Sequence, residues 1–436
     1  MKQSLRSLVS LLAAASSIRS ASAAVSQAFA PPSPRGPLVQ TANYTAFSNS
    51  TLDDKVTVAG KVFDRIMIVW LENTDFATAA ATPTFQKLAK EGILFTDYNS
   101  VTHPSQPNYI ASMGGDFFGA GDDTFVHIPS NITTVIDLLE EKGVSWAAYQ
   151  ESIPTDGFFG YSYTAPDYLG KGLSPYTYYM RKHNPPMIYD AVAGDAERVK
   201  RIRSFNDFAN DAVNGTLPQW MFVTPNMVND AHDTTIDFAA EFLDYWLVPL
   251  LSDTRVNGDR TLILLTFDET ETYSEQNTVY TVALGSAIPA KLKGTKDATL
   301  YTHYSLISTV QANWDLQSLG RQDTNKTVAK VFDFVAQEIG YTNTKTSHVP
   351  HFNLTGIFNG PLNPYQFQNF PAPNVSAVGV SGRPVLLRPG LDTKLTVDKL
   401  PAPVNLHAKN RASPYQMNVA TTSLKNIIPC TNAACS

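Results

Sequence analysis

Continuous apolar runs recur along the chain and are separated by amphipathic stretches. The first run, residues 66–71, has the unbroken hydrophobicity of a strand that is buried on both faces. Four later runs share this property, at residues 144–149, 220–223, 262–265 and 279–284. Between them lie segments with helical character, at residues 83–91, 133–142, 236–251 and 305–316. Buried strands that alternate with helices predict an α/β fold with a mostly parallel central sheet and helices on both faces.

The two ends of the chain differ in amino-acid composition from this central part. Residues 1–23 combine a basic start, a short apolar run and a small-residue cleavage site, which predicts a signal peptide that is removed. Residues 24–60, rich in Ala, Ser, Pro and Thr, predict an extended N-terminal arm. The catalytic domain is then expected over residues 61–345. Residues 346–436 are rich in Pro and Asn and predict a small β-rich appendage or a tail draped over the domain.

Several features favour secretion. The chain has seven Asn-x-Ser/Thr sequons, which together favour a glycoprotein: Asn43, Asn49, Asn131, Asn214, Asn325, Asn353 and Asn374. The two cysteines, Cys430 and Cys435, both lie in the tail and can close a small disulfide loop in an oxidising compartment. The apolar run in the leader is too short to span a bilayer. We therefore expect an extracellular or cell-wall protein without stable membrane insertion.

The net charge limits the range of partners. The formal charge is −6, and removal of a leader with three basic and no acidic residues would bring it to −9. An acidic surface argues against nucleic acid as a partner. Any phosphate site must then obtain positive potential locally, from a metal ion, a helix N-terminus or a few basic side chains.

Polar and titratable residues follow three of the apolar runs. Glu72 and Asn73 follow the first run, His232 and Asp233 come shortly after residues 220–223, and Asp268 and Glu269 follow residues 262–265. Any one of these groups is as easily a helix cap or a turn. Three at equivalent positions favour a site, because ligands bind beyond the carboxyl ends of strands in open α/β sheets. The oxygen-rich set suits a hard or borderline divalent cation, of unknown identity, better than a soft one.

A second candidate element is the segment of residues 103–109, His-Pro-Ser-Gln-Pro-Asn-Tyr. The prolines stiffen the backbone around Ser105, and the following residues predict a helix that ends at Gly114. Ser105 would then lie near a helix N-terminus, which favours an anion. A nucleophile and a helix cap are equally good interpretations of this serine alone. Because the chain lacks a G-x-S-x-G elbow, acyl transfer is poorly supported.

Taken in order, these motifs resemble a known family. Residues 72–76, 103–109, 181–185, 225–226 with 232–233, and 268–269 occur in the order seen in the phosphoesterase family. That family holds secreted fungal acid phosphatases and non-specific phospholipases C and lies within the alkaline-phosphatase-like superfamily. The resemblance covers roughly residues 62–335, and the fungal acid phosphatases look most similar.

The resemblance implies roles for individual residues. Four residues match metal ligands: Glu72, Asn73, Asp268 and Glu269. Ser105 matches the nucleophile, which also touches the metal, and His232 matches the group that protonates the leaving oxygen. The remaining matches are substrate-binding positions: Asn108, Lys182, His183 and Asp233. The implied activity is that of a secreted acid phosphatase acting on small phosphate monoesters through a phosphoserine, with an acidic pH optimum.

Two alternatives remain open. The phospholipases usually carry Arg-Ser where this chain has Thr74 and Asp75, and arginine where it has Tyr109. The loss of both arginines disfavours a lipid diester, but a phosphodiesterase on the same fold stays an alternative. The other is a wall-associated glycoprotein that only binds. For His103 and His303, a role beside the site and a structural role are equally good interpretations.

Overall fold

The structure is a computed structural model that describes residues 29, 36–55, 57–166, 175–346, 358–401, 404–405 and 413–417. The predicted leader, the sequon at Asn353 and the cysteines Cys430 and Cys435 lie outside these residues. Of the other sequons, Asn49, Asn214, Asn325 and Asn374 are exposed, and Asn43 and Asn131 are half-buried. None of the helices within the described residues has the length and hydrophobicity that a membrane span requires.

A sheet of eight strands forms the centre of the molecule, in the order β11-β2-β10-β9-β1-β8-β4-β7. All five predicted runs are confirmed as strands of this sheet: β1 (Arg65–Leu71), β4 (Trp146–Gln150), β8 (Trp220–Thr224), β9 (Thr261–Phe267) and β10 (Thr281–Leu284). The other three are β2 (Ile93–Phe95), β7 (Ile202–Ser204) and β11 (Thr295–Asp297). Only β10 runs antiparallel to its neighbours, so the sheet is mostly parallel, as predicted.

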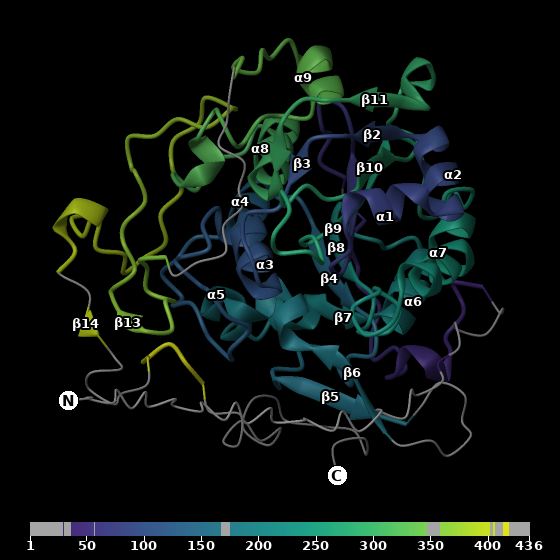
Figure 1. Ribbon diagram of the computed structural model, residues 1–436, viewed down its shortest axis with the longest axis horizontal. Coiled ribbons are helices and arrows are strands. Elements are labelled where there is room, and N and C mark those ends of the chain that lie inside the picture. The colour runs from purple at the N-terminus through teal and green to yellow at the C-terminus, as the bar shows by residue number, and fades with distance from the viewer. Residues whose placement is uncertain are drawn as a thin grey trace, which may run out of the picture.

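Helices form a layer on each side of the sheet (Figure 1). One layer holds α1 (Phe76–Ala81), α2 (Pro83–Glu91), α6 (Phe205–Asn214) and α7 (Ile236–Leu250). The other holds α3 (Ser105–Gly114), α4 (Val135–Lys142), α5 (Asp190–Ala193), α8 (His303–Trp314) and α9 (Asp333–Ile339). Helices on both faces explain the unbroken apolar runs, because the side chains of residues 66–71 are buried on both sides of the sheet.

Smaller elements decorate this core. The short strands form three two-stranded pairs: β3 (Tyr98–Asn99) with β12 (Tyr301–Thr302), β5 (Ser162–Ala165) with β6 (Tyr176–Met180), and β13 (Gln366–Phe367) with β14 (Val404–Asn405). The 3-10 helices are η1 (Ala42–Tyr44), η2 (Arg181–His183), η3 (Pro185–Ile188), η4 (Arg198–Arg201), η5 (Ala290–Leu292), η6 (Gln322–Thr324) and η7 (Val397–Lys399).

The described parts of both ends are bound to the catalytic domain. In the N-terminal arm, the backbone N–H groups of Thr41 and Leu52 donate to side chains of α6, at 2.9 and 3.1 Å. In the C-terminal segment, the N–H of Leu386 donates to the carbonyl of Ser318 at 2.9 Å. Within residues 358–401 and 404–405, regular strand is confined to the two-residue pair β13–β14. The described part of the C-terminal segment therefore lies over the domain, and the rest of the predicted appendage stays a prediction.

A buried acidic group beside the arm allows a test of stability against pH. Asp156 lies 3.5 Å from Arg203, and burial together with the charge of Asp207 raises the pKa of Asp156 to about 8, although Arg203 opposes the rise. Because the pKa of this carboxyl is higher in the folded than in the unfolded state, the folded protein becomes less stable as the pH rises from about 4 to about 8. We expect Asp156→Asn to raise the free energy of unfolding at pH 7.5 by at least about 1 kcal/mol.

The same substitution should change the free energy of unfolding little at pH 4, where Asp156 is protonated in the fold. Urea unfolding at both values, with the exposed Asp259→Asn as a matched control, measures the difference. Equal destabilisation at the two pH values would show that Asp156 is ionised and paired in the folded protein.

Candidate active site

Three loops meet at the carboxyl edge of the central strands. Strands β9, β1 and β8 are parallel neighbours, so the residues that follow them lie together. Glu72 follows β1, Asp268 and Glu269 follow β9, and Asp230 lies in the loop after β8. The N–H groups of Glu72 and Asp268 bond the carbonyls of Asp230 and Leu71. The sequence prediction that these strand ends form one site agrees with this arrangement.

Ser105 is the first residue of α3 and lies against this cluster. The preceding residue, Pro104, adopts extended backbone and ends the loop, so the helix begins at the serine. The hydroxyl of Ser105 donates to Glu72 Oε2 at 3.0 Å and lies 3.4 Å from Glu269 Oε1. Its side chain is buried, but it contacts two carboxylates that come from separate strands. Such contacts distinguish it from a helix cap, since the N-cap of α3 is Pro104 and Ser105 is the first helical residue.

Four carboxyl groups are buried at this edge: Glu72, Asp230, Asp268 and Glu269. Burial and the charge of Glu72 raise the pKa of Asp268 and of Asp230 well above the ordinary range. The same two causes raise the pKa of Glu269 to about 9. Oxygen Oδ2 of Asp268 is buried without a hydrogen-bond partner among the described residues. Clustered acidic oxygens with an unsatisfied member fit a hard divalent cation, which would remove the repulsion between them.

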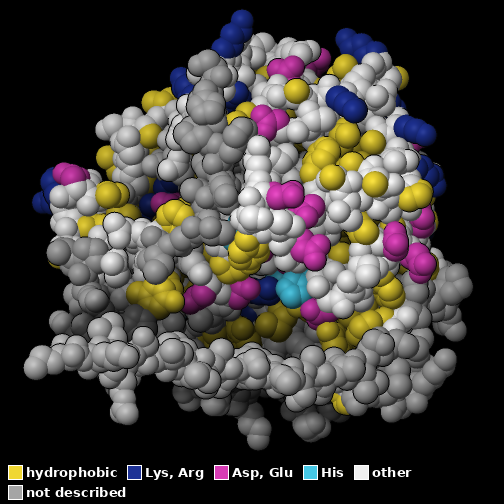
Figure 2. Space-filling view, in the orientation of Figure 1, with side chains coloured by type: hydrophobic (Ala, Val, Ile, Leu, Met, Phe, Trp, Pro, Cys, Tyr) yellow, Lys and Arg dark blue, Asp and Glu magenta, His cyan; other side chains and the backbone are white. Residues whose placement is uncertain are grey.

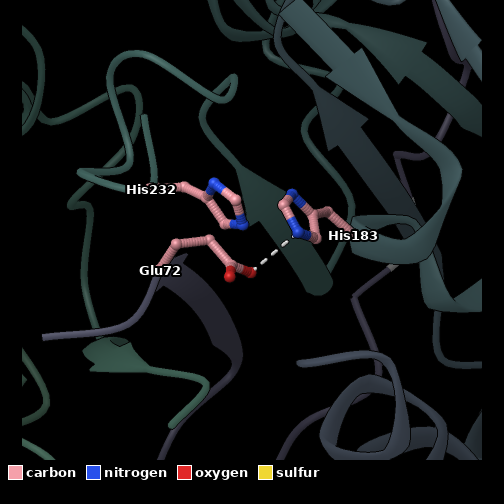
Figure 3. A group of neighbouring side chains, drawn as sticks. All are labelled: Glu72, His183 and His232. Carbon is pink, nitrogen blue, oxygen red and sulfur yellow. Dashed lines mark ion pairs between the residues drawn. The ribbon is translucent and has the colours of Figure 1, made fainter. Parts of the chain in front are cut away.

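Two histidines approach the same cluster (Figure 3). Nε2 of His183 lies 3.0 Å from Glu72 Oε1, and the ligand atoms of Glu72, His183 and His232 all lie within 4.8 Å of one another. Burial, followed by the charges of Lys182 and His232, holds the pKa of His183 well below its usual range. Glu72, His183 and His232 thus form a second possible set of metal ligands, which shares Glu72 with the predicted one.

Lys182 is the basic side chain that links the cluster to the surface. Its Nζ donates to Asp123 Oδ2 at 3.0 Å and lies 3.3 Å from His232 Nε2. Burial acts to lower the pKa of Lys182, but the carboxylates of Glu72 and Asp123 outweigh it and raise that pKa. Asp123 also accepts from the N–H of Gln106 at the start of α3. Figure 2 shows a hollow in which a histidine lies beside a lysine or arginine, with acidic side chains on either side.

His232 is held by Asp233, which the sequence prediction placed among the substrate-binding residues. Nδ1 of His232 lies 2.7 Å from Asp233 Oδ1, and the hydroxyl of Tyr176, from β6, donates to Asp233 Oδ2 at 2.6 Å. The backbone N–H of His232 donates to Asp230 at 2.9 Å. These bonds fix the ring with Nε2 toward Lys182. Asp233 therefore positions His232 in this structure.

The side chain of Asn108 hydrogen-bonds the backbone of the loop that precedes Ser105. Its Oδ1 accepts from the N–H groups of Val101 and Thr102, and its Nδ2 donates to the carbonyls of Thr102 and Pro104. Both ends of the amide thus hold the loop that precedes Ser105. The predicted contact with a phosphate oxygen stays a prediction. Asn73 is half-buried directly after Glu72, as its predicted role as a ligand requires.

Sequence reasoning missed several side chains that support the site. Tyr109 donates to Glu72 Oε1 at 2.5 Å. Nδ1 of His103 lies 2.8 Å from Glu269 Oε2, and Nε2 of His303 lies 2.7 Å from the carbonyl of Asp268. His103 and His303 therefore have roles beside the site, one of the two interpretations that the sequence left open. Helical spacing gave a signal for Tyr109, which lies one turn after Ser105.

A serine at a helix start, set among buried carboxylates at the carboxyl edge of a mostly parallel sheet, forms the candidate active site of this fold. The chain belongs to the phosphoesterase family, whose model matches residues 58–317. A probable acid phosphatase of Kluyveromyces lactis is 46% identical over 76% of this chain and 75% of its own. An acid phosphatase of Aspergillus fumigatus is 45% identical over 72% of this chain and 68% of its own.

A protein in the alkaline phosphatase superfamily from Vibrio parahaemolyticus aligns with a TM-score of 0.38 and 12% identity, over 63% of this chain and 73% of that one.

Proposed function

We propose that this chain is a secreted acid phosphatase that hydrolyses small phosphate monoesters, with Ser105 as the nucleophile and a divalent metal ion as cofactor. The relatives that support an acid phosphatase are similar over more than two thirds of both chains. The observation that carries the proposal is the position of the Ser105 hydroxyl, 3.0 Å from one strand-end carboxylate and 3.4 Å from another. Secretion and glycosylation rest on the leader and the sequons.

The metal is assigned to the predicted set, Glu72, Asn73, Asp268 and Glu269, with Ser105 beside it. A divalent ion held there would supply positive charge for the phosphate oxygens and would favour ionisation of the serine hydroxyl. A buried atom without a hydrogen-bond partner among the described residues is present in each set, Oδ2 of Asp268 in this one and Nε2 of His183 in the other, so the choice rests on the larger number of buried carboxylates here. Oxygen donors also suit a hard cation, whereas imidazoles suit borderline ones.

The other steps of the reaction are assigned to side chains of the chain itself. Ser105 Oγ forms a bond to phosphorus while the bond from phosphorus to the leaving oxygen breaks. Glu72, which accepts a hydrogen bond from the Ser105 hydroxyl, takes the proton of that hydroxyl. The ammonium group of Lys182 binds phosphate oxygens. This contact competes with the contact between Lys182 Nζ and Nε2 of His232. His232 protonates the leaving oxygen through Nε2, since Asp233 accepts from Nδ1. In the second step water attacks phosphorus and gives a proton to His232, the bond from phosphorus to Ser105 Oγ breaks to release phosphate, and the proton held by Glu72 returns to the serine.

The role of His232 predicts a dependence on the leaving group. His232→Ala should lower kcat/KM for alkyl phosphates at least about a hundredfold more than for 4-nitrophenyl phosphate, whose leaving group needs little protonation. Steady-state kinetics on both esters measure the difference, and Asp233→Asn should show the same pattern to a smaller degree. Equal losses on the two substrates would assign His232 to binding or to structure.

The phosphodiesterase alternative finds no support at the two departing positions. The two arginines are replaced by Thr74 and Tyr109; the hydroxyl of Tyr109 donates to Glu72, and the hydroxyl of Thr74 lies 3.5 Å from the carbonyl oxygen of Glu72. Both side chains thus contact groups of the protein. Hydrolysis of phosphatidylcholine at a rate above that of 4-nitrophenyl phosphate would overturn the preference for monoesters.

A further inference from the structure

An open pocket of about 480 Å³ lies between the β5–β6 hairpin and the loop that follows β8. Its walls come from both sides of this junction: Tyr176 and Met180 from β6, and Met227 and Asp233 from the loop. The two sides are tied together by backbone, because the N–H of Met227 donates to the carbonyl of Tyr178 at 3.0 Å. The N–H of Asp233 in turn donates to the carbonyl of Met227 at 2.9 Å. The pocket therefore has a fixed shape near the site.

This pocket opens beside the group that serves the leaving oxygen. Asp233, which lines it, is the residue that holds His232, at 2.7 Å. Met180, also in its wall, directly precedes η2, which carries Lys182 and His183. An in-line displacement sends the leaving group away from the nucleophile and toward the acid that protonates it. The pocket thus adjoins His232 on the side of Asp233, where the alcohol part of a phosphate ester can lie.

The chemistry of the lining selects the kind of alcohol. Two methionines, a tyrosine ring and a proline supply apolar surface, and a serine and a threonine supply hydroxyl groups. Among the described residues, Asp233 is the one charged side chain of the lining. Methionine side chains adapt to apolar groups of varied shape. A second phosphate on the alcohol would lie next to the carboxylate of Asp233 here.

We infer that this pocket is the subsite for the leaving group and that it selects monoesters of uncharged, largely apolar alcohols. The inference rests on the proposed phosphatase function and adds the class of substrate to it. Tyr176 takes part twice, since its ring lines the pocket while its hydroxyl holds Asp233. Its ring is itself packed, with its centroid 5.4 Å from that of Tyr178 and 5.0 Å from that of Phe29.

Methyl and n-hexyl phosphate give a direct test, because their leaving groups differ little in basicity and only the longer one reaches into a pocket. For the wild-type enzyme, kcat/KM should be at least about tenfold higher for n-hexyl than for methyl phosphate. Met180→Ala and Met227→Ala should each reduce this ratio at least about threefold. Hexanediol bisphosphate, of similar length but with a phosphate at each end, should be a poor substrate of the wild type.

Met180→Lys supplies the missing cation and tests the charge argument without depending on Met227, whose loss can affect folding. It should raise kcat/KM for hexanediol bisphosphate relative to n-hexyl phosphate at least about tenfold. The control Val213→Lys adds the same charge on an exposed position of α6 and should leave that ratio unchanged.

The outcomes separate the two proposals. If the wild type, loaded with metal, hydrolyses none of these monoesters, the proposed phosphatase function fails. If it hydrolyses methyl and n-hexyl phosphate equally well, or if the ratios of the Met180 variants equal those of the wild type, the pocket is not the leaving-group subsite and the phosphatase function stands.

Discussion

Asp268→Asn is expected to abolish metal binding and to lower kcat/KM at least about a thousandfold while the fold is retained. Oδ2 of Asp268, like Oδ2 of Asp230, is a buried carboxylate oxygen at the site that lacks a hydrogen-bond partner among the described residues, and an amide supplies a much weaker ligand in its place. The substitution removes one of four neighbouring acidic groups, so the metal-free protein should be no less stable than the wild type.

Three measurements on one preparation check this expectation. Elemental analysis gives the metal content, far-UV circular dichroism reports the fold, and the Tm is measured with and without a chelator. Chelation should lower the Tm of the wild type and leave that of the variant unchanged, because binding to the folded state alone stabilises it. The exposed Asp259→Asn serves as the matched control. A variant that keeps both one equivalent of metal and full turnover would remove Asp268 from the set of ligands.

The fold was largely predictable because its strands are continuous apolar runs. Such runs signal strands buried under helices, and the residues that follow them mark one edge of the sheet. The direction of β10 was not predictable, since a buried run has the same pattern whether its neighbours are parallel or antiparallel. Strands of three residues, such as β2 and β7, carry too short a pattern to be distinguished from loops.

The candidate site was predictable where its residues follow strands, and less so where it depends on distant contacts. Glu72 and Glu269 flank Ser105 because adjacent strands place them there. Asp123 and Tyr176, by contrast, reach Lys182 and Asp233 from segments whose position is set by tertiary packing. No local pattern marks such a contact. Asn108 is the opposite case. It lies inside a motif that predicts a substrate contact, but its amide bonds the backbone of the loop before Ser105.

Ser105→Ala is expected to lower kcat/KM by about four orders of magnitude or more, because the nucleophile and a metal contact are lost together. The hydroxyl oxygen is the atom that lies between Glu72 and Glu269, and alanine leaves both carboxylates without it. Ser112→Ala is the matched control, since Ser112 lies on the same helix and donates only to the carbonyl of Tyr109 at 2.8 Å. The control should keep wild-type turnover, and both variants should unfold as cooperatively as the wild type.

The loss of activity alone does not distinguish a nucleophile from a ligand, and the stereochemical course does. Two in-line displacements, first by Ser105 and then by water, give net retention at phosphorus, whereas direct attack by water gives inversion. The covalent route also predicts phosphoryl transfer to an added alcohol in a ratio that is the same for every ester, because all pass through one phosphoserine. A chiral phosphate ester turned over by the wild type decides the matter. Inversion would make Ser105 a ligand of metal or phosphate and would leave the phosphatase assignment in place.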